Sequence, residues 1–507
     1  MIQWLKASDI ELKTMTRRNF LFGSAALAAT TAVGRARDLK PNLRVGILSD
    51  IHVTGQSHAD IFKKALRYYD SIKVDAVMIA GDLTTWSKLE EFELVAKSWY
   101  EVFPGDRRSD GEKVERLFVT GNHEVDGFAY AGAKFKTLEE AKPKSFYFHR
   151  EDFWRRLFHE DYRQLSVRTV KGYSFVLRNW VSMLRNEPLA KAAGCLPEKN
   201  GLGAFLAAQD LPKDKPFFYL QHDMPNDTVN ASWLVGGARW GNGHDDGEST
   251  KHLSKYPNVI AFSGHCHNSL CDEMSIWQGA FTAVNCGCTC GFTFTPPGRE
   301  NGWNCDDFNR DPPFEMARFP HDAIHEGIVM EVFDDAVVLE RREFLHDHVL
   351  GPDWVIPLGK GAAKPYTVAA RFASAKAPAF PKGAKVTVKE GEGCGRSAAG
   401  TGRAKEKHPQ IFVSFPPART LDGSPARGWD YSVRCELVAG DIVRTLCERC
   451  VFSEGAFFAE EDETKPVVCA FAKTDVPAKL NARQKIRFAV TPRSCWGKAG
   501  APIFGNL

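Results

Sequence analysis

Ser263-Gly264-His265-Cys266-His267 directly follows the apolar run Val259-Ile260-Ala261-Phe262. A short, continuous apolar run that ends at a glycine predicts a buried β-strand. The two imidazoles that follow are two positions apart, so they can point at one place. In open α/β sheets ligands bind beyond the carboxyl ends of the strands. The stretch therefore predicts a ligand site at the end of a core strand.

Four strand-like runs upstream end in the same kind of side chain. They are Leu43–Leu48 before Asp50-Ile51-His52, Ala76–Ala80 before Gly81-Asp82, Leu117–Val119 before Gly121-Asn122-His123-Glu124, and Phe217–Leu220 before His222. Carboxylate, amide and imidazole groups suit hard and borderline metal ions. A dinuclear hydrolase needs two cations about 3.5–4 Å apart. The chain supplies a full ligand set for such a pair: Asp50, His52, Asp82, Asn122, His222, His265 and His267.

The bulk composition sets the class of protein. The chain has 507 residues, of which 43% are hydrophobic and 25% charged, which is typical of a globular protein. Chains beyond about 250–300 residues generally divide into domains, so we expect two or three. The formal net charge is only +3, so no global field favours nucleic acid and the sequence carries no nucleic-acid-binding signature.

Residues 41–350 are expected to form one α/β domain. Apolar residues recur near helical spacing in Ala59–Ile72 and Lys88–Phe103, between the strand-like runs. Gly327–Phe333 and Ala336–Phe344 alternate around Asp334-Asp335 and predict a hairpin that closes the sheet. Residues 291–325 hold many Pro, Gly and Asn and predict a long loop.

The character of the chain changes after a predicted linker at residues 351–365. Residues 366–507 hold short, alternating runs separated by turn residues, which predicts a smaller all-β domain of the sandwich kind, immunoglobulin- or fibronectin-like. These runs are Lys385–Lys389, Gln410–Phe415, Tyr431–Val438, Val467–Lys473 and Lys485–Val490. Gly391–Lys407 is expected to be an exposed loop.

The N-terminus predicts export. Thr16-Arg17-Arg18-Asn19-Phe20-Leu21-Phe22 is a twin-arginine pattern, and a weakly apolar run continues to Val33. That run is shorter than the about 20 residues needed to span a bilayer, and small residues near Ala32–Ala36 suit cleavage. Residues 1–36 resemble a twin-arginine (Tat) signal peptide, so we expect a periplasmic or extracellular protein without a transmembrane segment in the mature chain.

The thirteen cysteines leave at least one thiol unpaired, because their number is odd. An oxidising compartment would permit disulfides among the others. Cys286, Cys288 and Cys290 would share one face if they lay on an extended strand. Cys447 and Cys450 form a single CxxC, which without a second pair indicates zinc only weakly. Packing or disulfides are the expected roles of both groups.

The ordered blocks resemble the calcineurin-like metallophosphoesterase superfamily. Its signature is DxH, then GD, then GNH with an acid, then a lone His, then GHxH, and all five blocks occur here in that order without a ligand substitution. The resemblance covers roughly residues 41–350. It implies a four-layer α/β/β/α sandwich with mixed sheets, ahead of the all-β C-terminal domain.

The resemblance also implies roles for individual residues. Asp50, His52 and His267 would bind one metal ion, Asn122, His222 and His265 a second, and Asp82 would bridge the two. A hydroxide held between the metals would be the nucleophile. His123 would act on the substrate as general acid and protonate the leaving oxygen. Glu124 and Asp126 would orient the imidazoles from outside the ligand set.

Plainer interpretations exist for single residues. Asp50 and Asp82 could cap helices, because Asp favours N-caps. His222 could be a hydrogen-bonded core histidine, and the glycines of the motifs could be ordinary turn residues. Cys266, between two ligands, is interpreted as packing. Only the joint placement of the whole set after strand-like runs favours a metal centre over these alternatives.

The expected activity is an exported, metal-dependent phosphoesterase that hydrolyses phosphomono- or phosphodiester bonds, with a resemblance nearest to phosphodiesterase-type members. Its cofactors would be two divalent or trivalent ions, with Mn, Fe and Zn all suited to these ligands. Trp233, Trp240, Trp277, Trp303 and Arg239 could contact the substrate or serve packing and surface ion pairs. The competing hypothesis is a surface binding or adhesion protein, in which the C-terminal domain contacts a partner and carries the function.

Overall fold

The computed structural model of the protein describes residues 40–180, 188–193, 201–230, 232, 247–289, 325–393, 407–420, 428, 430–452 and 466–507. The predicted signal peptide at residues 1–36 lies outside the described residues, as do residues 291–324 of the predicted long loop and residues 394–406 of the predicted C-terminal loop. No helix in the described ranges combines the length and the apolar character that crossing a bilayer requires.

The first sheet contains seven strands in the order β12-β11-β10-β1-β2-β3, with β13 paired to β11. Its strands are β1 Leu43–Leu48, β2 Ala76–Ala80, β3 Glu115–Val119, β10 Glu326–Val332, β11 Ala336–Glu343, β12 His348–Val349 and β13 Trp354–Pro357. β1, β2 and β3 run parallel, whereas β10 and β11 form the predicted hairpin and run antiparallel to their neighbours. The carboxyl ends of the three parallel strands therefore lie at one edge.

The second sheet contains six strands in the order β4-β5-β6-β7-β9-β8. Its strands are β4 Leu165–Val170, β5 Tyr173–Arg178, β6 Phe217–Leu220, β7 Val259–Ser263, β8 Ile276–Gln278 and β9 Thr282–Asn285. β5, β6, β7 and β9 run parallel, and β4 and β8 are antiparallel edge strands. β6 and β7 are buried at every position, as expected for parallel strands covered on both faces.

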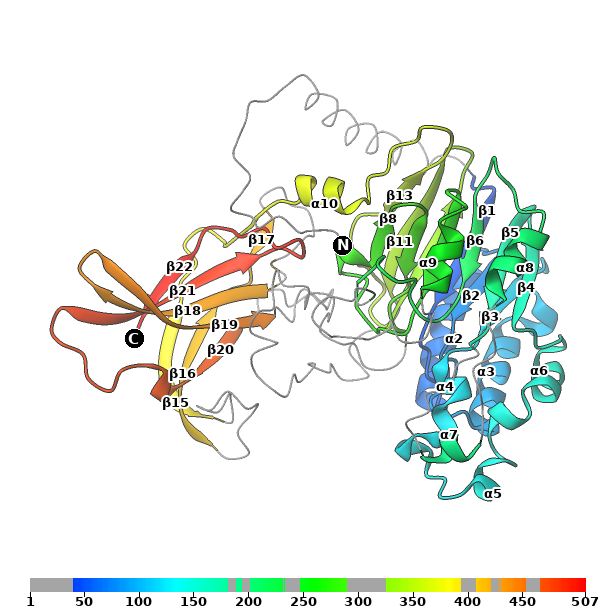
Figure 1. Ribbon diagram of the computed structural model, residues 1–507, viewed down its shortest axis with the longest axis horizontal. Helices are drawn as coiled ribbons and strands as arrows, with labels where there is room; N and C mark the ends of the chain where they lie inside the picture. The colour runs from blue at the N-terminus through cyan, green and yellow to red at the C-terminus, as the bar shows by residue number, and fades with distance from the viewer. Residues whose placement is uncertain are drawn as a thin grey trace.

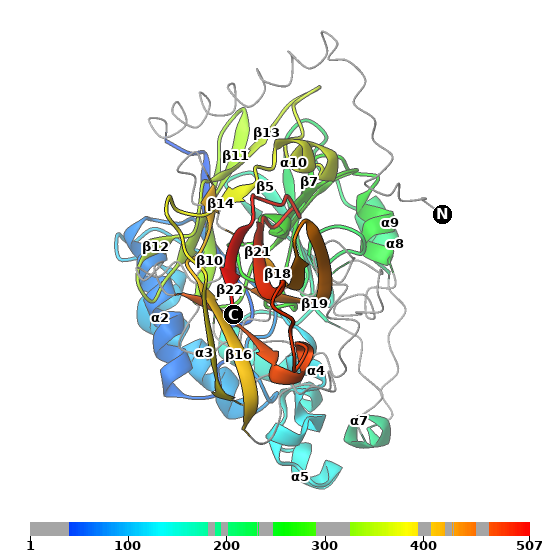
Figure 2. The same cartoon turned by 90° about the vertical axis from the view of Figure 1, so that its left-hand side faces the viewer.

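Helices cover the outer faces of both sheets. One core joins the two sheets through residues of β1, β2, β6 and β7. A second core packs α2 Gln56–Ser71, α3 Leu89–Val102 and α6 Arg150–Phe158 on the first sheet, and a third packs α8 Leu202–Ala208 and α9 Glu248–Leu253 on the second. Figure 2 shows α2 and α3 on one side of the paired sheets and α8 and α9 on the other. The predicted four-layer α/β/β/α sandwich is confirmed.

The remaining helices of the described ranges are short. They are α4 Asn122–Val125, α5 Leu138–Ala141, α7 Pro188–Ala192, α10 Val368–Ser374, and the 3-10 helices η2 Pro104–Asp106, η3 Gly127–Ala129, η4 Ala131–Ala133, η5 Phe146–Phe148, η7 Glu273–Ser275 and η9 Lys473–Asp475. α4 begins directly after the strand-end glycine of β3. α10 follows the first domain and precedes the second (Figure 1).

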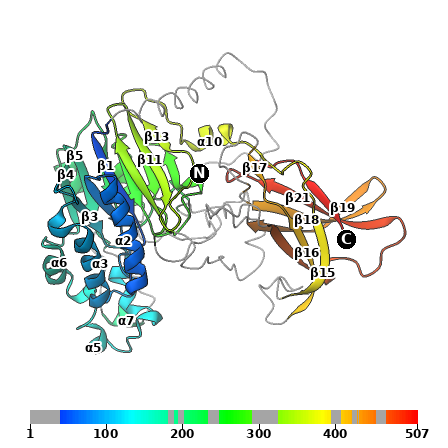
Figure 3. The ribbon, with the colours of Figure 1, turned by 180° about the vertical axis from the view of Figure 1, so that it is seen from behind.

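Where the structure describes the C-terminal part, it is all-β apart from α10 and η9. Its sheets have the orders β15-β16-β20, β19-β18-β21-β22 and β14-β17, all antiparallel. The strands are β14 Pro378–Ala379, β15 Thr387–Gly393, β16 His408–Phe415, β17 Arg419–Thr420, β18 Asp430–Ala439, β19 Ile442–Phe452, β20 Val467–Ala472, β21 Gln484–Arg493 and β22 Ile503–Asn506. One apolar core contains residues of β16, β18, β20 and β21, so the two larger sheets pack face to face. Figure 3 shows this β part beside the layered first domain.

The boundary between the two parts differs from the predicted one. Trp354–Pro357, inside the predicted linker at residues 351–365, forms β13 and pairs with β11. Tyr366 also packs in the core between the first two sheets, and its backbone amide donates to Gln278 Oε1 at 3.0 Å. Trp354-Val355-Ile356 is an apolar run of only three residues before a proline, so its pairing with β11 emerges only in the fold.

Candidate metal centre

Five of the predicted ligands have an unusual backbone. Asp50, His52, Asp82, His265 and His267 have φ values of 51°, 41°, 50°, 70° and 49°. Left-handed backbone is uncommon for residues other than glycine. Each such residue costs roughly 1–3 kcal/mol and persists where the surrounding structure enforces it, often at active sites. The strand ends are therefore held in a conformation that regular structure alone does not explain.

Hydrogen bonds between the strand-end loops enforce this conformation. The amide of Asp50 donates to the carbonyl of Gly81 at 3.1 Å, and that of His52 donates to the carbonyl of Asp82 at 3.0 Å. The amide of Gly264 donates to the carbonyl of His222 at 2.8 Å. The amide of His265 donates to Asp50 Oδ2 at 3.0 Å, which joins the loops of the two sheets. Neither Asp50 nor Asp82 caps a helix, because α2 and α3 follow Gly55 and Lys88.

Two motif glycines are required by close approach. A Cβ on Gly264 would lie 1.7 Å from Ser49 Oγ and 2.4 Å from Asp50 Oδ2. A Cβ on Gly81 would lie 2.4 Å from Nδ1 of His222, at a position whose φ is 87°. Such distances are impossible for real atoms, so these glycines let the ligand loops meet and are not ordinary turn residues.

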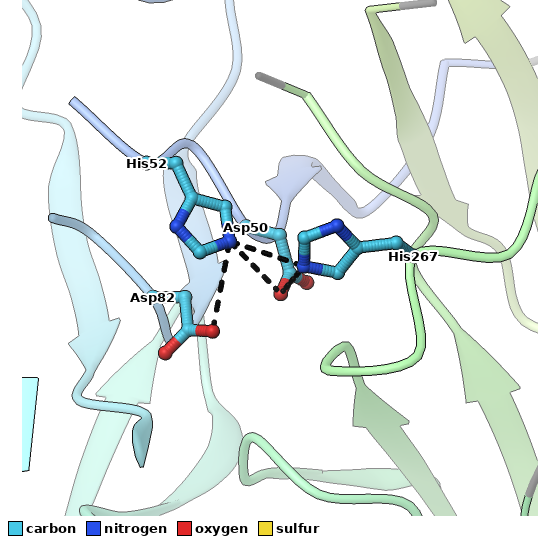
Figure 4. Close-up of side chains that lie close together, drawn as sticks. All are labelled: Asp50, His52, Asp82 and His267. Atoms are coloured by element: carbon cyan, nitrogen blue, oxygen red, sulfur yellow. Dashed lines mark hydrogen bonds and ion pairs between the residues drawn. The ribbon is translucent and has the colours of Figure 1, made fainter. Parts of the chain in front are cut away.

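Four of the predicted ligands form a first buried group. Asp50, His52, Asp82 and His267 each offer a ligand atom, and these atoms lie within 4.8 Å of one another. Nε2 of His52 is 3.0 Å from Nε2 of His267, which is itself 3.0 Å from Asp50 Oδ1. Figure 4 shows the four side chains pointing toward one another.

A second buried group shares one residue with the first. Asp82, His222 and His265 offer ligand atoms within 4.8 Å of one another. Nε2 of His222 lies 3.0 Å from Asp82 Oδ2, 3.1 Å from Asn122 Oδ1 and 3.2 Å from Nδ1 of His265. Asp82 belongs to both groups, which is the geometry that a bridging ligand requires.

Each carboxylate has one oxygen fixed by the protein and one turned to the centre. Asp50 Oδ2 accepts from Ser49 Oγ at 2.5 Å and from the amide of His265 at 3.0 Å. Asp50 Oδ1 is buried and, among the described residues, faces imidazole nitrogens instead of backbone amides or hydroxyls. Asp82 Oδ1 accepts from the amide of His123 at 3.0 Å, whereas Oδ2 faces the histidines. Inward-facing oxygens and imidazole nitrogens of this kind fit metal ions.

The electrostatics agree with a site for cations. Burial raises the pKa of Asp82, but His222 and His123 together lower it well below its usual value, so the carboxylate is ionised. Burial, followed by His123, lowers the pKa of His52 well below its usual value and keeps the ring neutral. Burial would lower the pKa of His222, but Asp82 and Asp50 raise it to about 9. A metal ion requires the deprotonated ligands, so it would replace the proton that this negative environment otherwise attracts to His222.

His123, the predicted general acid, lies beside the two groups but belongs to neither. Its ring centroid is 4.7 Å from that of His52. Nδ1 is 2.6 Å from the carbonyl oxygen of Thr85, and since a carbonyl only accepts, Nδ1 carries a proton. Nε2 is then the atom that gains or loses a proton.

The residues next to the ligands have roles that differ from some of the predictions. Glu124 accepts hydrogen bonds from the amides of Gly121 at 2.7 Å and Thr84 at 2.8 Å. It therefore connects the loops after β2 and β3, whereas it was expected from the sequence to orient an imidazole. Asp126 is buried. Cys266 is buried in the core beneath α8 and α9, as its interpretation as packing requires.

Four supporting residues carry no sequence signal of their own. Tyr130 accepts from Asn122 Nδ2 at 3.1 Å, which orients the amide oxygen toward His222. Cys288 Sγ lies 3.6 Å from Nδ1 of His267. Ser49 and Thr85 fix Asp50 and His123 through the hydrogen bonds given above. Ser49 adjoins a motif, but Tyr130, Thr85 and Cys288 are brought in by the fold and could not be found by spacing.

The alternating cysteines do not lie on one strand. β9 ends at Asn285, and Gly287 has a φ of 73°, so the extended backbone considered for Cys286 and Cys288 is absent. Cys286 packs in the core between the sheets, and Cys290 lies outside the described residues. Among the proposed substrate contacts, Trp277 packs against Phe281 at 5.5 Å between centroids. The others, namely Trp233, Trp240, Trp303 and Arg239, lie outside the described ranges.

Comparisons with known proteins address the first domain. Residues 43–269 match the model of the family described as calcineurin-like phosphoesterase. No curated protein matches the chain. Solved structures similar to it include a dimetal phosphatase from Danio rerio, at 12% identity over 63% of this chain and 100% of that one, with a TM-score of 0.37.

Two further structures are similar at the same level. They are the purple acid phosphatase PPD1 of yellow lupin (13% identity, 63% of this chain, 55% of that one, TM-score 0.37) and GAP50, described as the anchor in the inner membrane complex of Plasmodium (12% identity, 64% and 90%, TM-score 0.33). All three TM-scores are below 0.5. The similarity of residues 43–269 to calcineurin-like phosphoesterases therefore rests on the family model and on the two groups of metal-binding residues.

Proposed function

We propose that residues 43–269 form a calcineurin-like phosphoesterase domain with its metal-binding residues intact. From this premise we infer that the protein is an exported phosphoric ester hydrolase. It would cleave phosphomono- or phosphodiester bonds at a dinuclear metal centre. The observation that carries the proposal is the position of Asp82. One buried carboxylate shared by two ligand groups is what a pair of adjacent cations requires.

The predicted ligands would bind two metal ions. One ion would be held by Asp50, His52 and His267, and the other by Asn122, His222 and His265. Asp82 would bind both ions. Mn, Fe and Zn all suit these ligands. When bound, such ions supply positive charge to the phosphoryl group and lower the pKa of water toward neutrality. The burial of the ligands keeps their geometry fixed and strengthens their electrostatic effect.

His123 is proposed as the general acid. The hydrogen bond from Nδ1 to the carbonyl of Thr85 keeps that nitrogen protonated in both charge states, so Nε2 alone exchanges a proton. The amide of the same residue donates to Asp82 Oδ1, which fixes the backbone of His123 relative to the ligands. A side chain so placed can deliver a proton to a leaving oxygen, a contribution of about 10²–10⁴ in rate.

Export is proposed from the sequence alone. The twin-arginine pattern at Thr16–Phe22 and the short apolar run after it support a Tat-type signal peptide. Cell fractionation with an antibody against the folded chain tests this: the mature protein is expected in the periplasm or medium. Replacement of Arg17 and Arg18 by Lys should retain it in the cytoplasm, and unchanged export of that variant would contradict the proposal.

The activity is tested with the purified full chain. Loaded with Mn²⁺, it should hydrolyse bis-p-nitrophenyl phosphate, p-nitrophenyl phosphate or both, and a chelator should abolish the rate. Asp60→Asn is a matched control, because Asp60 is an exposed carboxylate on α2. Background rates on both substrates with each of Mn²⁺, Fe²⁺ and Zn²⁺ would refute the proposed function.

A further inference from the structure

Two cysteines of the C-terminal domain occupy directly opposite positions on neighbouring strands. In the antiparallel pair β18–β19, Cys435 is the register partner of Cys447. The register shifts immediately afterwards, where Glu436 pairs with Thr445 and Leu446 is the extra residue. The cysteine pair therefore adjoins a β-bulge.

The two side chains also face the same core. Cys435 is fully buried, and Cys447 is partly buried and packs against the same apolar cluster. The thiols are hydrogen-bonded to each other; this bond, followed by burial, raises the pKa of Cys435. The structure has both residues as thiols rather than as a disulfide.

This placement matches the geometry of a disulfide. Directly opposite residues of an antiparallel pair have Cα atoms about 4.5–5.5 Å apart, which lies within the about 4.4–6.8 Å usual for the Cα atoms of a disulfide. The other nearby cysteines have different neighbours: Cys469 on β20 is opposite Val413, and Cys450 on β19 is opposite Ser432. The register thus selects Cys447 as the partner of Cys435.

A link at this point would act on a weakly restrained strand. β19 is the outermost strand of its sheet and pairs only with β18 among the described strands. Its first residues, at the tip of the hairpin, are exposed: Ile442 is 72% and Val443 47% accessible. Edge strands and bulges are places where register slips and where other chains can pair. A covalent bond beside the bulge would fix one register.

We propose that Cys435 and Cys447 form a structural disulfide once the protein is in an oxidising compartment, and that this bond locks the register of β18 and β19. The two S–H bonds break, one S–S bond forms, and two protons and two electrons leave. The electrons pass by thiol–disulfide exchange to an oxidised dithiol–disulfide oxidoreductase or, in vitro, to oxidised glutathione. The inference rests on the proposed export for its oxidising compartment, but not on the phosphoesterase activity, because neither cysteine lies in the first domain.

Mass mapping tests the pairing directly. The full chain is incubated with oxidised glutathione, alkylated in denaturant, and digested without reduction. The expected product is one peptide pair that joins Cys435 to Cys447 and disappears on reduction. Recovery of both residues as alkylated thiols, or of Cys447 linked mainly to Cys450 or another cysteine, would overturn the proposal.

Thermal unfolding tests the consequence. Oxidation should raise the apparent Tm of the C-terminal domain by roughly 5 °C. Cys447→Ser should lose this redox-dependent rise, whereas the control Cys469→Ser, in the same core, should keep it even if its Tm is lower throughout. A rise that persists in Cys447→Ser, or a wild-type chain whose Tm does not respond after complete oxidation, would contradict the proposal.

Discussion

Buried carboxylates occur in both parts of the molecule, but with different partners. In the C-terminal domain Asp430 pairs with Arg493 at 2.7 Å and Glu436 with Arg487 at 2.6 Å. At the strand ends of the first domain, the ion-pair partners recorded for Asp50 and Asp82 within the described residues are imidazoles. The negative charge of a carboxylate beside an arginine is balanced by the positive charge of that arginine. Two buried carboxylates whose partners are imidazoles attract positive charge, which without a metal ion is the proton on His222 and which bound metal ions would replace.

The largest effect is expected from the shared carboxylate. Asp82→Asn keeps the size of the side chain but removes the charge from both ligand groups. Because metal ions supply several kcal/mol of charge stabilisation, kcat on the phosphoester substrates should fall by roughly 10³-fold or more. Steady-state kinetics measures this, with Asp60→Asn expected to stay within twofold. If the kcat of Asp82→Asn stayed within tenfold of the wild-type value, the carboxylates at the strand ends would not differ in function from those paired with arginine.

His123→Gln should have the next largest effect. The substitution removes the proton donor but changes no residue of either ligand group. The kcat should therefore fall by about 10²–10⁴-fold, while the metal content of the protein stays unchanged. The loss should be larger for an alkyl phosphoester than for a p-nitrophenyl ester, whose leaving group needs little protonation. Equal losses on both substrates would argue that His123 acts by another route.

Glu273 tests the arginine-paired kind of carboxylate. It lies 2.9 Å from Arg341 Nη1 and contacts Arg371 of α10; burial would raise its pKa, but Arg341 and Arg371 lower it to about 2. Glu273→Gln should reduce the free energy of unfolding by about 2–3 kcal/mol at neutral pH, because Arg341 is left buried without a carboxylate.

The pH dependence of that loss follows from the sign of the shift. A carboxylate with a depressed pKa stabilises the fold above the unfolded value near 4.5, and this contribution is lost as pH falls toward about 2. Denaturant titrations of both proteins should therefore differ most above pH 5 and converge in acid, while kcat stays within twofold at neutral pH. A constant difference at every pH would mean that packing and not charge is responsible.

Tyr130→Phe should have a smaller effect at the metal centre. It removes the hydroxyl that accepts from Asn122 Nδ2 and so frees the amide to rotate. Groups that orient metal ligands typically contribute 10–100-fold in affinity, and for this partly buried contact we expect roughly tenfold weaker binding of the second ion. Metal titration should show one site weakened and the other unchanged. Equal weakening of both sites would indicate a general disturbance of the fold.

The smallest effect is expected at the hairpin tip of the C-terminal domain. Ile442→Ser changes a side chain that is 72% exposed, so stability should change by less than about 0.5 kcal/mol and kcat should not change. The same variant addresses the competing hypothesis of a binding function. Loss of cell-surface or polymer binding in a pull-down with Ile442→Ser, with hydrolysis intact, would show that residues 366–507 contact a partner.

The sequence predicted the metal-binding loops better than the elements that support them. Buried parallel strands are continuous apolar runs, so β1, β2, β6 and β7 could be found with their polar ends. β4 was not predicted, because its residues are mostly half-buried and lack a continuous apolar run. β5 was not predicted, because its apolar run is only the three residues Phe175–Leu177. Contacts such as Tyr130 to Asn122 depend on how the loops after β3 turn, which no local pattern specifies. The immunoglobulin-like character of the C-terminal domain stays a prediction.

Metal analysis of the purified full chain tests the central claim most directly. After loading with Mn²⁺ and removal of free ions, elemental analysis of the wild type should find close to two ions per chain, and Asp82→Asn should retain about one or none, because the shared carboxylate serves both ions. Two ions retained equally by wild type and Asp82→Asn, or none retained by the wild type with Mn²⁺, Fe²⁺ or Zn²⁺, would contradict a dinuclear centre bridged by Asp82.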